Sequence, residues 1–242
     1  MLVEVCANSL ESALNAQKAG ADRIELCTEL GVGGVTPSLG LLRAVKEHID
    51  IPVNVLIRPR SGDFTYSEEE FGIMMADIAV CVDMGFNGIV SGALHANFQI
   101  DVERTTQLIA ASRALKFTFH RAFDWVTDPF EALDLLQGLH VDTILSSGQQ
   151  KSAPEGFGLL ADLHKASHQV TIMPGGGLQA GNIGLFKEIG FRAVHLSASS
   201  PEETLASEPK VSMNSPSFIS DRKIFRSSPE KLEKFIKEVK KA

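Results

Sequence analysis

The sequence predicts a single closed (β/α)8 barrel, the TIM-barrel fold, from its strand count, strand spacing and chain length. Eight strand-like runs begin near residues 2, 23, 53, 88, 116, 143, 170 and 193, and helix-compatible sequence follows each of them. Their starts lie 21 to 35 residues apart, which fits a parallel strand followed by its crossover helix. The chain has 242 residues, close to the ~250 typical of such a barrel. We therefore expect residues 1–242 to form one domain.

The first strand-like run, residues 2–8, predicts one packed face and one chemical face. Val3 and Val5 fall on one side of a period-two pattern, whereas Glu4 and Cys6 fall on the other. The polar character of this second side increases toward the end of the run. We therefore expect the polar side to face the mouth of the barrel.

The second run, residues 23–27, repeats this arrangement. Glu25 and Cys27 have the Glu-x-Cys spacing of the first run, and Ile24 and Leu26 lie on the opposite side. Consecutive strands are neighbours in a barrel of this type. We therefore expect the two Glu-x-Cys motifs to lie on adjacent strands and on the same face of the sheet.

The remaining strands are short runs that end in polar side chains. In the fifth, Phe117 and Phe119 alternate with Thr118 and His120, so His120 is expected to face the same way as Glu4. We expect these six strands at residues 53–58, 88–92, 116–121, 143–148, 170–173 and 193–197.

Capping residues and apolar periodicity predict the helices between the strands. Ser9 is suited to cap the first helix and Gly20 to end it. Ser67 and Glu70 have the spacing of a capping box, in which each residue's side chain bonds the other's backbone. We expect helices at residues 9–20, 36–49, 71–85, 101–113, 128–139 and 154–166, and a closing helix from residue 228.

Residues 199–227 interrupt the alternation of strands and helices. The segment is rich in serine and proline and lacks helical periodicity, so we expect it to be irregular. Its apolar side chains need a cover, which is either the segment's own barrel or a second copy of the chain. We favour the second copy and expect a homodimer or a higher homo-oligomer. The side chains concerned are Leu205, Val211, Met213, Phe218, Ile219 and Phe225.

The composition argues against several classes of protein. A net charge of −7 argues against nucleic-acid binding, and the Lys and Arg residues after Asp221 are expected to form a solvated face. No apolar run approaches the ~18 residues of a membrane-spanning helix. The chain begins with strand-like sequence rather than a secretory signal, and three cysteines are too few for a disulfide framework. We therefore expect a cytoplasmic protein with reduced thiols.

The ends of the predicted strands, where the sites of such barrels lie, supply candidate catalytic residues. Arg58 would neutralise the charge of a substrate, and either glutamate would exchange a proton with His120. The competing interpretation is that Glu–Arg pairs only fill the barrel. The candidates are Glu4, Glu25, Arg58, His120 and Asp124.

A second group of residues is suited to bind a phosphate or another small anion. Three glycines follow the seventh strand and a serine ends the eighth, where barrels commonly bind phosphate through backbone N–H groups. No lysine ends a strand, which argues against a Schiff-base aldolase. The group comprises Arg60, Ser147, Gly175, Gly176, Gly177 and Ser197.

Six motifs of the chain resemble the CutC family of copper homeostasis proteins. The match extends over nearly the whole chain and fades after about residue 200. The resemblance implies a cytoplasmic barrel, usually oligomeric, that is associated with copper handling and has no firmly assigned catalytic activity. The motifs are EVCANS at 4–9, AGADRIELC at 19–27, GGVTPS at 33–38, IRPR at 57–60, FHRAFD at 119–124 and SGQ at 147–149.

With this resemblance, Cys6 and Cys27 become candidate metal ligands. Soft thiolates select Cu(I), and strands about 4.8 Å apart would let two sulfurs approach one ion. The simpler alternative is that both cysteines are small buried hydrophobic residues. We expect a copper homeostasis protein that binds Cu(I) at the barrel mouth. Two other classes stay open: an isomerase or lyase acting on a small anionic or phosphorylated substrate, and a non-catalytic interaction protein.

Overall fold

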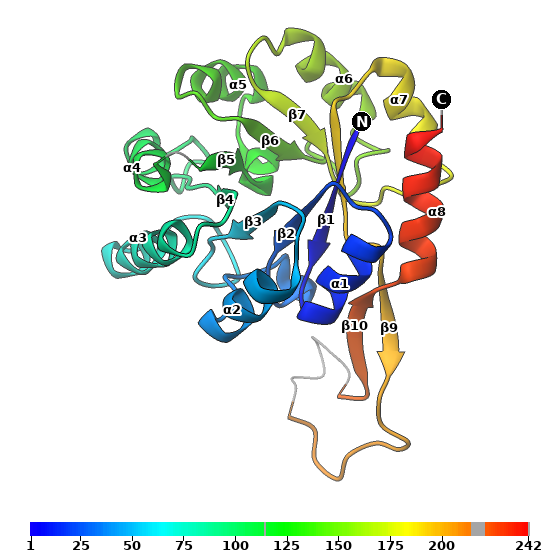
Figure 1. Ribbon diagram of the computed structural model, residues 1–242. Helices are drawn as coiled ribbons and strands as arrows, with labels where there is room; N and C mark the ends of the chain where they lie inside the picture. The colour runs from blue at the N-terminus through cyan, green and yellow to red at the C-terminus, as the bar shows by residue number, and fades with distance from the viewer. Residues whose placement is uncertain (114, 214–220, 242) are drawn as a thin grey trace.

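The computed structural model is a barrel of eight parallel strands with helices around it (Figure 1). It describes residues 1–113, 115–213 and 221–241. The strand order is β7-β6-β5-β4-β3-β2-β1-β8, and a bridge between Gly175 and His195 joins β7 to β8. The predicted (β/α)8 barrel is therefore confirmed. The strands are β1 (Leu2–Ala7), β2 (Arg23–Leu26), β3 (Val53–Leu56), β4 (Gly88–Ser91), β5 (Lys116–Phe119), β6 (Thr143–Ser146), β7 (Thr171–Pro174) and β8 (Ala193–Leu196).

The helices lie on the outside of the barrel, one after each strand in the order expected. Ser9, Ser38 and Ser67 cap three of them, and Ser67 forms the predicted capping box with Glu70. The helices are α1 (Leu10–Lys18), α2 (Leu39–His48), α3 (Glu68–Asp83), α4 (Val102–Ser112), α5 (Pro129–Gly138), α6 (Phe157–Ala166), α7 (Ile183–Ile189) and α8 (Pro229–Lys240), with 3-10 helices at Leu30–Val32 and Arg121–Trp125.

Seven of the barrel strands end one or two residues earlier than the sequence suggested, whereas β7 ends one residue later. In β5 the cause is local, because His120 leaves the strand to accept a hydrogen bond from the backbone N–H of Ala122 and so starts the 3-10 helix. The polar residues that follow each strand therefore lie in loops above the sheet. Loop positions leave their side chains free to line a site.

Two kinds of packing hold the barrel together. Outward-facing side chains such as Val3 and Val5 are fully buried against the helices in one large apolar core. Inside the barrel, small clusters form instead, and one contains Cys6 and Cys27 beside Leu56. The predicted division of β1 into a packed face and a chemical face is confirmed, since Glu4 and Cys6 lie inside.

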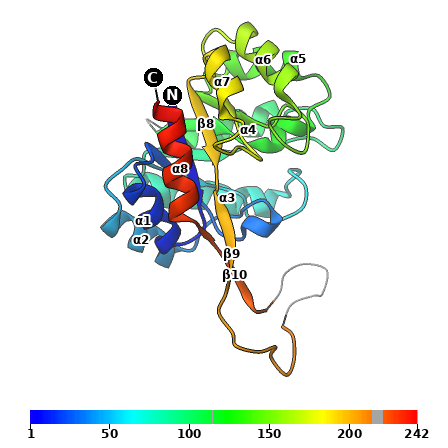
Figure 2. The same cartoon turned by 90° about the vertical axis from the view of Figure 1, so that its right-hand side faces the viewer.

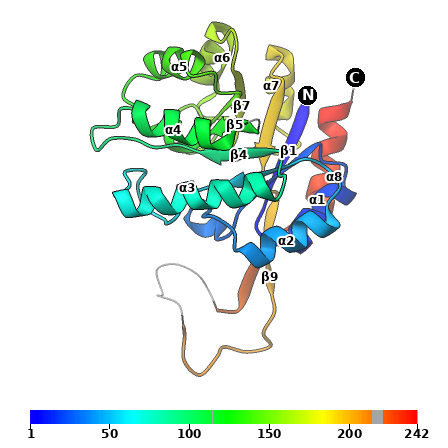
Figure 3. The same ribbon diagram turned by 60° about the vertical axis from the view of Figure 1, so that its left-hand side comes forward.

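The segment 199–227 is not irregular at its two ends. β9 (Ser199–Glu203) and β10 (Lys223–Ser227) pair as an antiparallel ribbon that projects from the barrel (Figures 2 and 3). Ion pairs between the two strands stabilise it, because Arg226 contacts Glu202 and Arg222 contacts Glu203, each at 2.9 Å.

The part of the segment beyond the ribbon carries apolar side chains in solvent. Val211 is 74% exposed and Met213 is 90% exposed. Phe218 and Ile219, which we also expected to need a cover, lie outside the described residues. The barrel therefore does not cover Val211 and Met213, although β10 packs against α1.

The closing helix α8 returns from this ribbon and packs against α1 and α7 (Figure 1). Its apolar face, including Leu232 and Phe235, is buried, whereas Lys234 and Lys237 are exposed. The predicted amphipathic helix is confirmed. No helix among the described residues is both long and apolar enough to cross a membrane.

Candidate functional site

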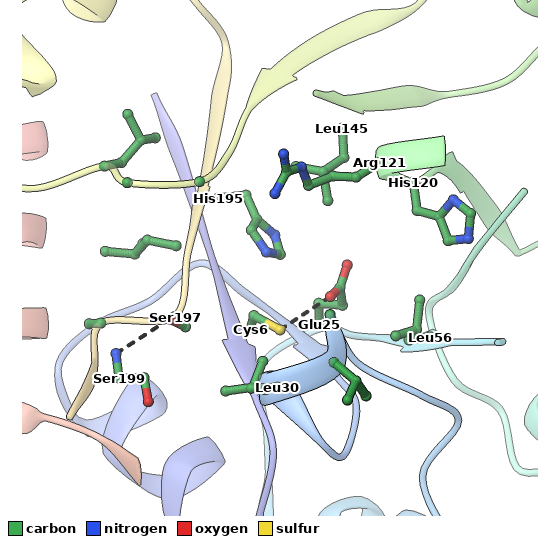
Figure 4. Close-up of a pocket in the computed structure, with 18 of the residues that line it drawn as sticks. Cys6, Glu25, Leu30, Leu56, His120, Arg121, Leu145, His195, Ser197 and Ser199 are labelled. Atoms are coloured by element: carbon green, nitrogen blue, oxygen red, sulfur yellow. Dashed lines mark hydrogen bonds between the residues drawn. The ribbon is translucent and has the colours of Figure 1, made fainter. Parts of the chain in front are cut away.

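A cavity of about 1130 Å³ opens at the C-terminal ends of the strands, where the site was predicted. Loops after β2, β3, β5, β7 and β8 form its wall, and α8 forms part of its rim (Figure 4). Seven predicted residues line it, namely Cys6, Glu25, Arg58, His120, Gly176, Gly177 and Ser197. Six do not, namely Glu4, Cys27, Arg60, Asp124, Ser147 and Gly175.

Glu4 lies below the cavity and is completely buried in an ion-pair network. The parallel registers place Arg23 and His195 beside it on the two neighbouring strands. Arg23 Nε donates to Glu4 Oε2 at 2.5 Å, and His195 Nδ1 lies 2.9 Å from Glu4 Oε1. Glu4 is therefore neutralised by two basic groups, as expected of a buried carboxylate.

The network shifts the pKa values of its members in opposite directions. Burial acts to raise the pKa of Glu4, but the hydrogen bonds and charges of His195 and Arg23 prevail and lower it. Burial acts to lower the pKa of His195, but Glu25 and Glu4 prevail and raise it. Glu4 and His195 together therefore favour the carboxylate–imidazolium pair.

The two cysteine sulfurs meet at the base of the cavity. Cys6 Sγ lies 3.5 Å from Cys27 Sγ and donates to Glu25 Oε1 at 3.2 Å. The contact with Cys27, burial and nearby Glu25 raise the pKa of the Cys6 thiol well above its usual range. Ligand atoms of Cys6, Glu25 and His195 all lie within 4.8 Å of one another. These atoms converge as metal ligands do, and a soft ion is the kind that displaces protons from such thiols.

Glu25 differs from Glu4 in forming no ion pair with the described residues. Burial raises its pKa, and its Oε2 atom is buried without a hydrogen-bond partner among the described residues. Figure 4 shows its carboxyl group rising into the cavity between Cys6 and His195. A buried polar atom without a partner is costly, and a ligand is one way to satisfy it.

His120 lines the opposite wall, apart from both glutamates. Its Nδ1 accepts from Ala122 N at 3.3 Å, which leaves the proton of the neutral ring on Nε2. Burial and the charge of Arg58 lower the pKa of His120 to about 3. Nε2 is buried without a partner among the described residues. The expected proton exchange with a glutamate has no contact to support it here, because His195 is the histidine that contacts Glu4.

Arg58 holds loops together rather than standing free for a substrate. Its guanidinium donates to the carbonyl oxygens of Val32, Gly34 and Gly62 at 2.7 to 2.9 Å. It also lies over the ring of Phe64, with 5.0 Å between the guanidinium carbon and the ring centroid. Its charge still contributes to the cavity wall, since the residue lines it.

Arg60 points away from the cavity. Its Nε donates to Glu70 at 2.5 Å, and its Nη2 donates to Asp63 at 3.1 Å. These contacts order the loop after β3 and connect it to the start of α3. The predicted role of Arg60 in anion binding therefore has no support from its position.

Asp124 and Ser147 join two loops behind the cavity wall. Asp124 accepts from the hydroxyl of Ser146 at 2.6 Å, from the backbone N–H of Ser147 at 3.0 Å and from Arg121 Nε at 2.8 Å. Ser147 Oγ donates to Gln150 O at 2.5 Å. The cluster positions Arg121, which does line the cavity.

Four basic residues of the cavity were absent from the predicted site. His195 carried a signal, because it alternates inward on the eighth strand, which must pair with the first to close the barrel. Arg121 lay inside a quoted motif but not among the candidates. Lys231 and Lys234 were assigned to a solvated face of α8, and only the folded chain brings that face to the mouth.

Comparisons with known proteins agree with this architecture. The model of the CutC family matches residues 1–200. The chain is 46% identical over 197 residues to a protein of Salmonella enteritidis named family protein CutC. The aligned region covers 81% of this chain and 79% of the relative. It is 45% identical over 215 residues to a Klebsiella pneumoniae protein of the same name. This aligned region covers 88% of this chain and 87% of the relative.

Solved structures give the same result. A crystal structure from Streptococcus agalactiae that carries the name copper homeostasis protein CutC superposes with a TM-score of 0.77 at 34% identity, covering 81% of this chain and 98% of the other. Phosphoribosyl anthranilate isomerase from Thermus thermophilus superposes with a TM-score of 0.56 at 15% identity, covering 99% of this chain and 98% of the other. The similarity is one of fold alone. The chain therefore belongs to the CutC family.

Proposed function

We propose that this protein acts in copper homeostasis by binding Cu(I) through the thiolates of Cys6 and Cys27. The observation that carries the proposal is the 3.5 Å separation of the two sulfurs at the base of the cavity. Two sulfurs at this distance can approach one ion with small side-chain movements. His195 and Glu25 lie close to Cys6 and would complete the surroundings of the ion.

The chemistry of the pocket suits a soft monovalent ion. Thiolates select Cu(I), whereas hard divalent ions prefer oxygen ligands. Binding displaces the thiol protons, and the raised pKa of Cys6 therefore makes affinity fall as the pH is lowered. Burial of both cysteines keeps competing water away from the sulfurs.

The decisive experiment is competition for Cu(I) between the reduced protein and a chromogenic chelator. The Cys6→Ser/Cys27→Ser variant should lose tight binding of one ion per chain. Cys81→Ser is the matched control, because Cys81 is equally buried but lies on α3, away from the cavity. Equal binding by the double variant and the wild type would refute the proposal.

A cytoplasmic location and a homodimer belong to the same proposal. Reducing conditions would keep the free thiols available to the ion. The exposed apolar side chains of Val211 and Met213 support self-association through the arm that carries β9 and β10. Light scattering tests the assembly, because a mass near 26.2 kDa at micromolar concentration would correspond to a monomer.

A further inference from the structure

The charge of the cavity is opposite to the charge of the whole protein. The chain carries a net charge of −7. Among the described residues that line the cavity, Glu25 is the one acidic side chain, against two arginines and two lysines. A cavity of this sign attracts anions despite the repulsion of the remaining surface. The four basic residues are Arg58, Arg121, Lys231 and Lys234.

Backbone N–H groups without a partner among the described residues lie in two adjoining loops of the cavity wall. The N–H groups of Gly176, Gly177 and Ala198 donate to no group in the described part of the chain. Gly176 and Gly177 have φ of 93° and 72°, and Ala198 has φ of 47°, which is unusual for a residue with a side chain. The Gly175–His195 bridge holds these two loops side by side. Adjacent free N–H groups form an anion-binding concavity.

Two cationic side chains border these donors. A methyl group on Gly176 would lie 3.6 Å from Arg121 Nη1, so the guanidinium is next to the turn. Figure 4 shows Arg121 extending across the cavity toward His195. Lys234 is exposed on α8 and makes no hydrogen bond or ion pair with the residues that the structure describes. Lys231, by contrast, already donates to Ser200 Oγ at 2.6 Å.

Two of the buried cavity atoms that lack a partner among the described residues belong to His120 and Glu25. His120 Nε2 offers a proton, and Glu25 Oε2 offers a second polar group. Both residues are at least nine-tenths buried, so solvent does not satisfy these atoms cheaply. A ligand that carries hydroxyl groups can serve both, because a hydroxyl both donates and accepts.

We propose that the cavity binds the phosphate monoester of a small polyhydroxy compound. The phosphate lies against the N–H groups of Gly176, Gly177 and Ala198, with Arg121 and Lys234 beside it. The hydroxyl-bearing carbons extend toward His120 and Glu25. This site shares Glu25 with the proposed Cu(I) site, but neither sulfur contributes to it.

The protein's single tryptophan, Trp125, provides the measurement. Trp125 lines the cavity and is 45% exposed, so its fluorescence should respond to a bound molecule. Ribose 5-phosphate is the probe, and ribose and inorganic phosphate are the comparison ligands. We expect saturable binding of ribose 5-phosphate, weaker binding of inorganic phosphate and no binding of ribose.

Lys234→Gln should weaken the binding of ribose 5-phosphate about fivefold, the upper range for a solvent-exposed ion pair. Lys237→Gln is the matched control, because Lys237 is exposed on the same helix but does not line the cavity. The Cys27→Ser variant should bind the probe as the wild type does, whatever happens to its copper binding, because Cys27 does not line the cavity. Absence of saturable binding, or equal weakening by the two lysine variants, would overturn the proposal.

Discussion

The Glu-x-Cys motifs of β1 and β2 are alike in sequence but differ in their surroundings. Glu4 is fully buried and contacts both Arg23 and His195. Glu25 has one hydrogen bond, from Cys6, and one oxygen without a partner among the described residues. The same pair of residue types therefore makes a neutralised network on one strand and an open carboxyl on the next.

The strand register causes this difference. Cys6 is opposite Glu25 rather than opposite Cys27, so the second motif lies two residues further along the barrel axis than the first. Glu4 then falls in the layer of Arg23 and His195, below the cavity. Glu25 falls in the layer of Cys6, at the cavity surface. The height of a carboxyl group along the barrel axis therefore decides whether it is part of the buried ion-pair network, as Glu4 is, or faces the cavity, as Glu25 does.

The largest expected effect is that of Glu4→Gln. Removing the carboxylate leaves the buried His195 and the half-buried Arg23 without their counter-charge, which costs about 3 kcal/mol in the free energy of unfolding. Urea denaturation at pH 6 measures it. A loss below about 1 kcal/mol would show that Glu4 is not the centre of the network.

The second prediction concerns pH. The lowered pKa of Glu4 gives stability that is present above pH 4.5 and is lost as the pH falls through its folded value. The raised pKa of His195 gives stability that is present below pH 6.5 and is lost as the pH rises through its folded value. The Glu4–His195 pair should therefore stabilise the folded protein most between pH 4.5 and pH 6.5.

His195→Gln tests the alkaline side of that window. The free energy of unfolding of the wild type should fall more steeply above pH 6.5 than that of the variant, because only the wild type releases the His195 proton. Other titrating groups are common to both proteins. Parallel curves from pH 6 to pH 8 would mean that His195 does not hold an extra proton in the folded state.

A smaller effect is expected for Cys6→Ala. The variant loses the contact with Cys27 and the single hydrogen bond that Glu25 accepts, at a cost of about 1 kcal/mol. Cys27→Ala leaves the bond to Glu25 intact and is the matched control. Urea denaturation of the two metal-free variants measures the loss in the free energy of unfolding. A greater loss for Cys27→Ala than for Cys6→Ala would show that Cys27 contributes more to stability than Cys6.

The smallest effect is expected for Glu25→Gln. Burial already opposes the charge of Glu25, and the amide oxygen of glutamine still accepts from Cys6. The free energy of unfolding at pH 7 should change by less than about 1 kcal/mol. A loss as large as that of Glu4→Gln would erase the difference between the two strands.

The barrel and the inward faces of its strands were predictable from sequence, because alternation and spacing depend on local chemistry. Glu4, Cys6, Glu25 and Cys27 were all assigned to one face, and the structure agrees. Their layers were not predictable, because the stagger between strands is a property of the closed barrel. His120 is separated from the glutamates for another reason, because β3 and β4 lie between β5 and β2 in the barrel.

The ribbon of β9 and β10 was missed for a different reason. Ser199–Glu203 contains serine, proline and glutamate, which have low strand propensity. Cross-strand ion pairs of Glu202 and Glu203 with Arg226 and Arg222 favour its pairing instead. Complementary charges about 20 residues apart were the available signal, and a search for apolar periodicity does not detect them.

The placement of β1 between β2 and β8 has a consequence for the order of folding. β1 is synthesised well before β8, which it needs as a neighbour, and α1 is covered by α8 (Figure 1). Asn8 Nδ2 also donates to Phe225 O, 217 residues away. Contacts of such long range form late during synthesis. The Glu4 network is therefore one of the last parts of the nascent chain to be assembled, and a chain interrupted before β8 exposes one unpaired edge of β1.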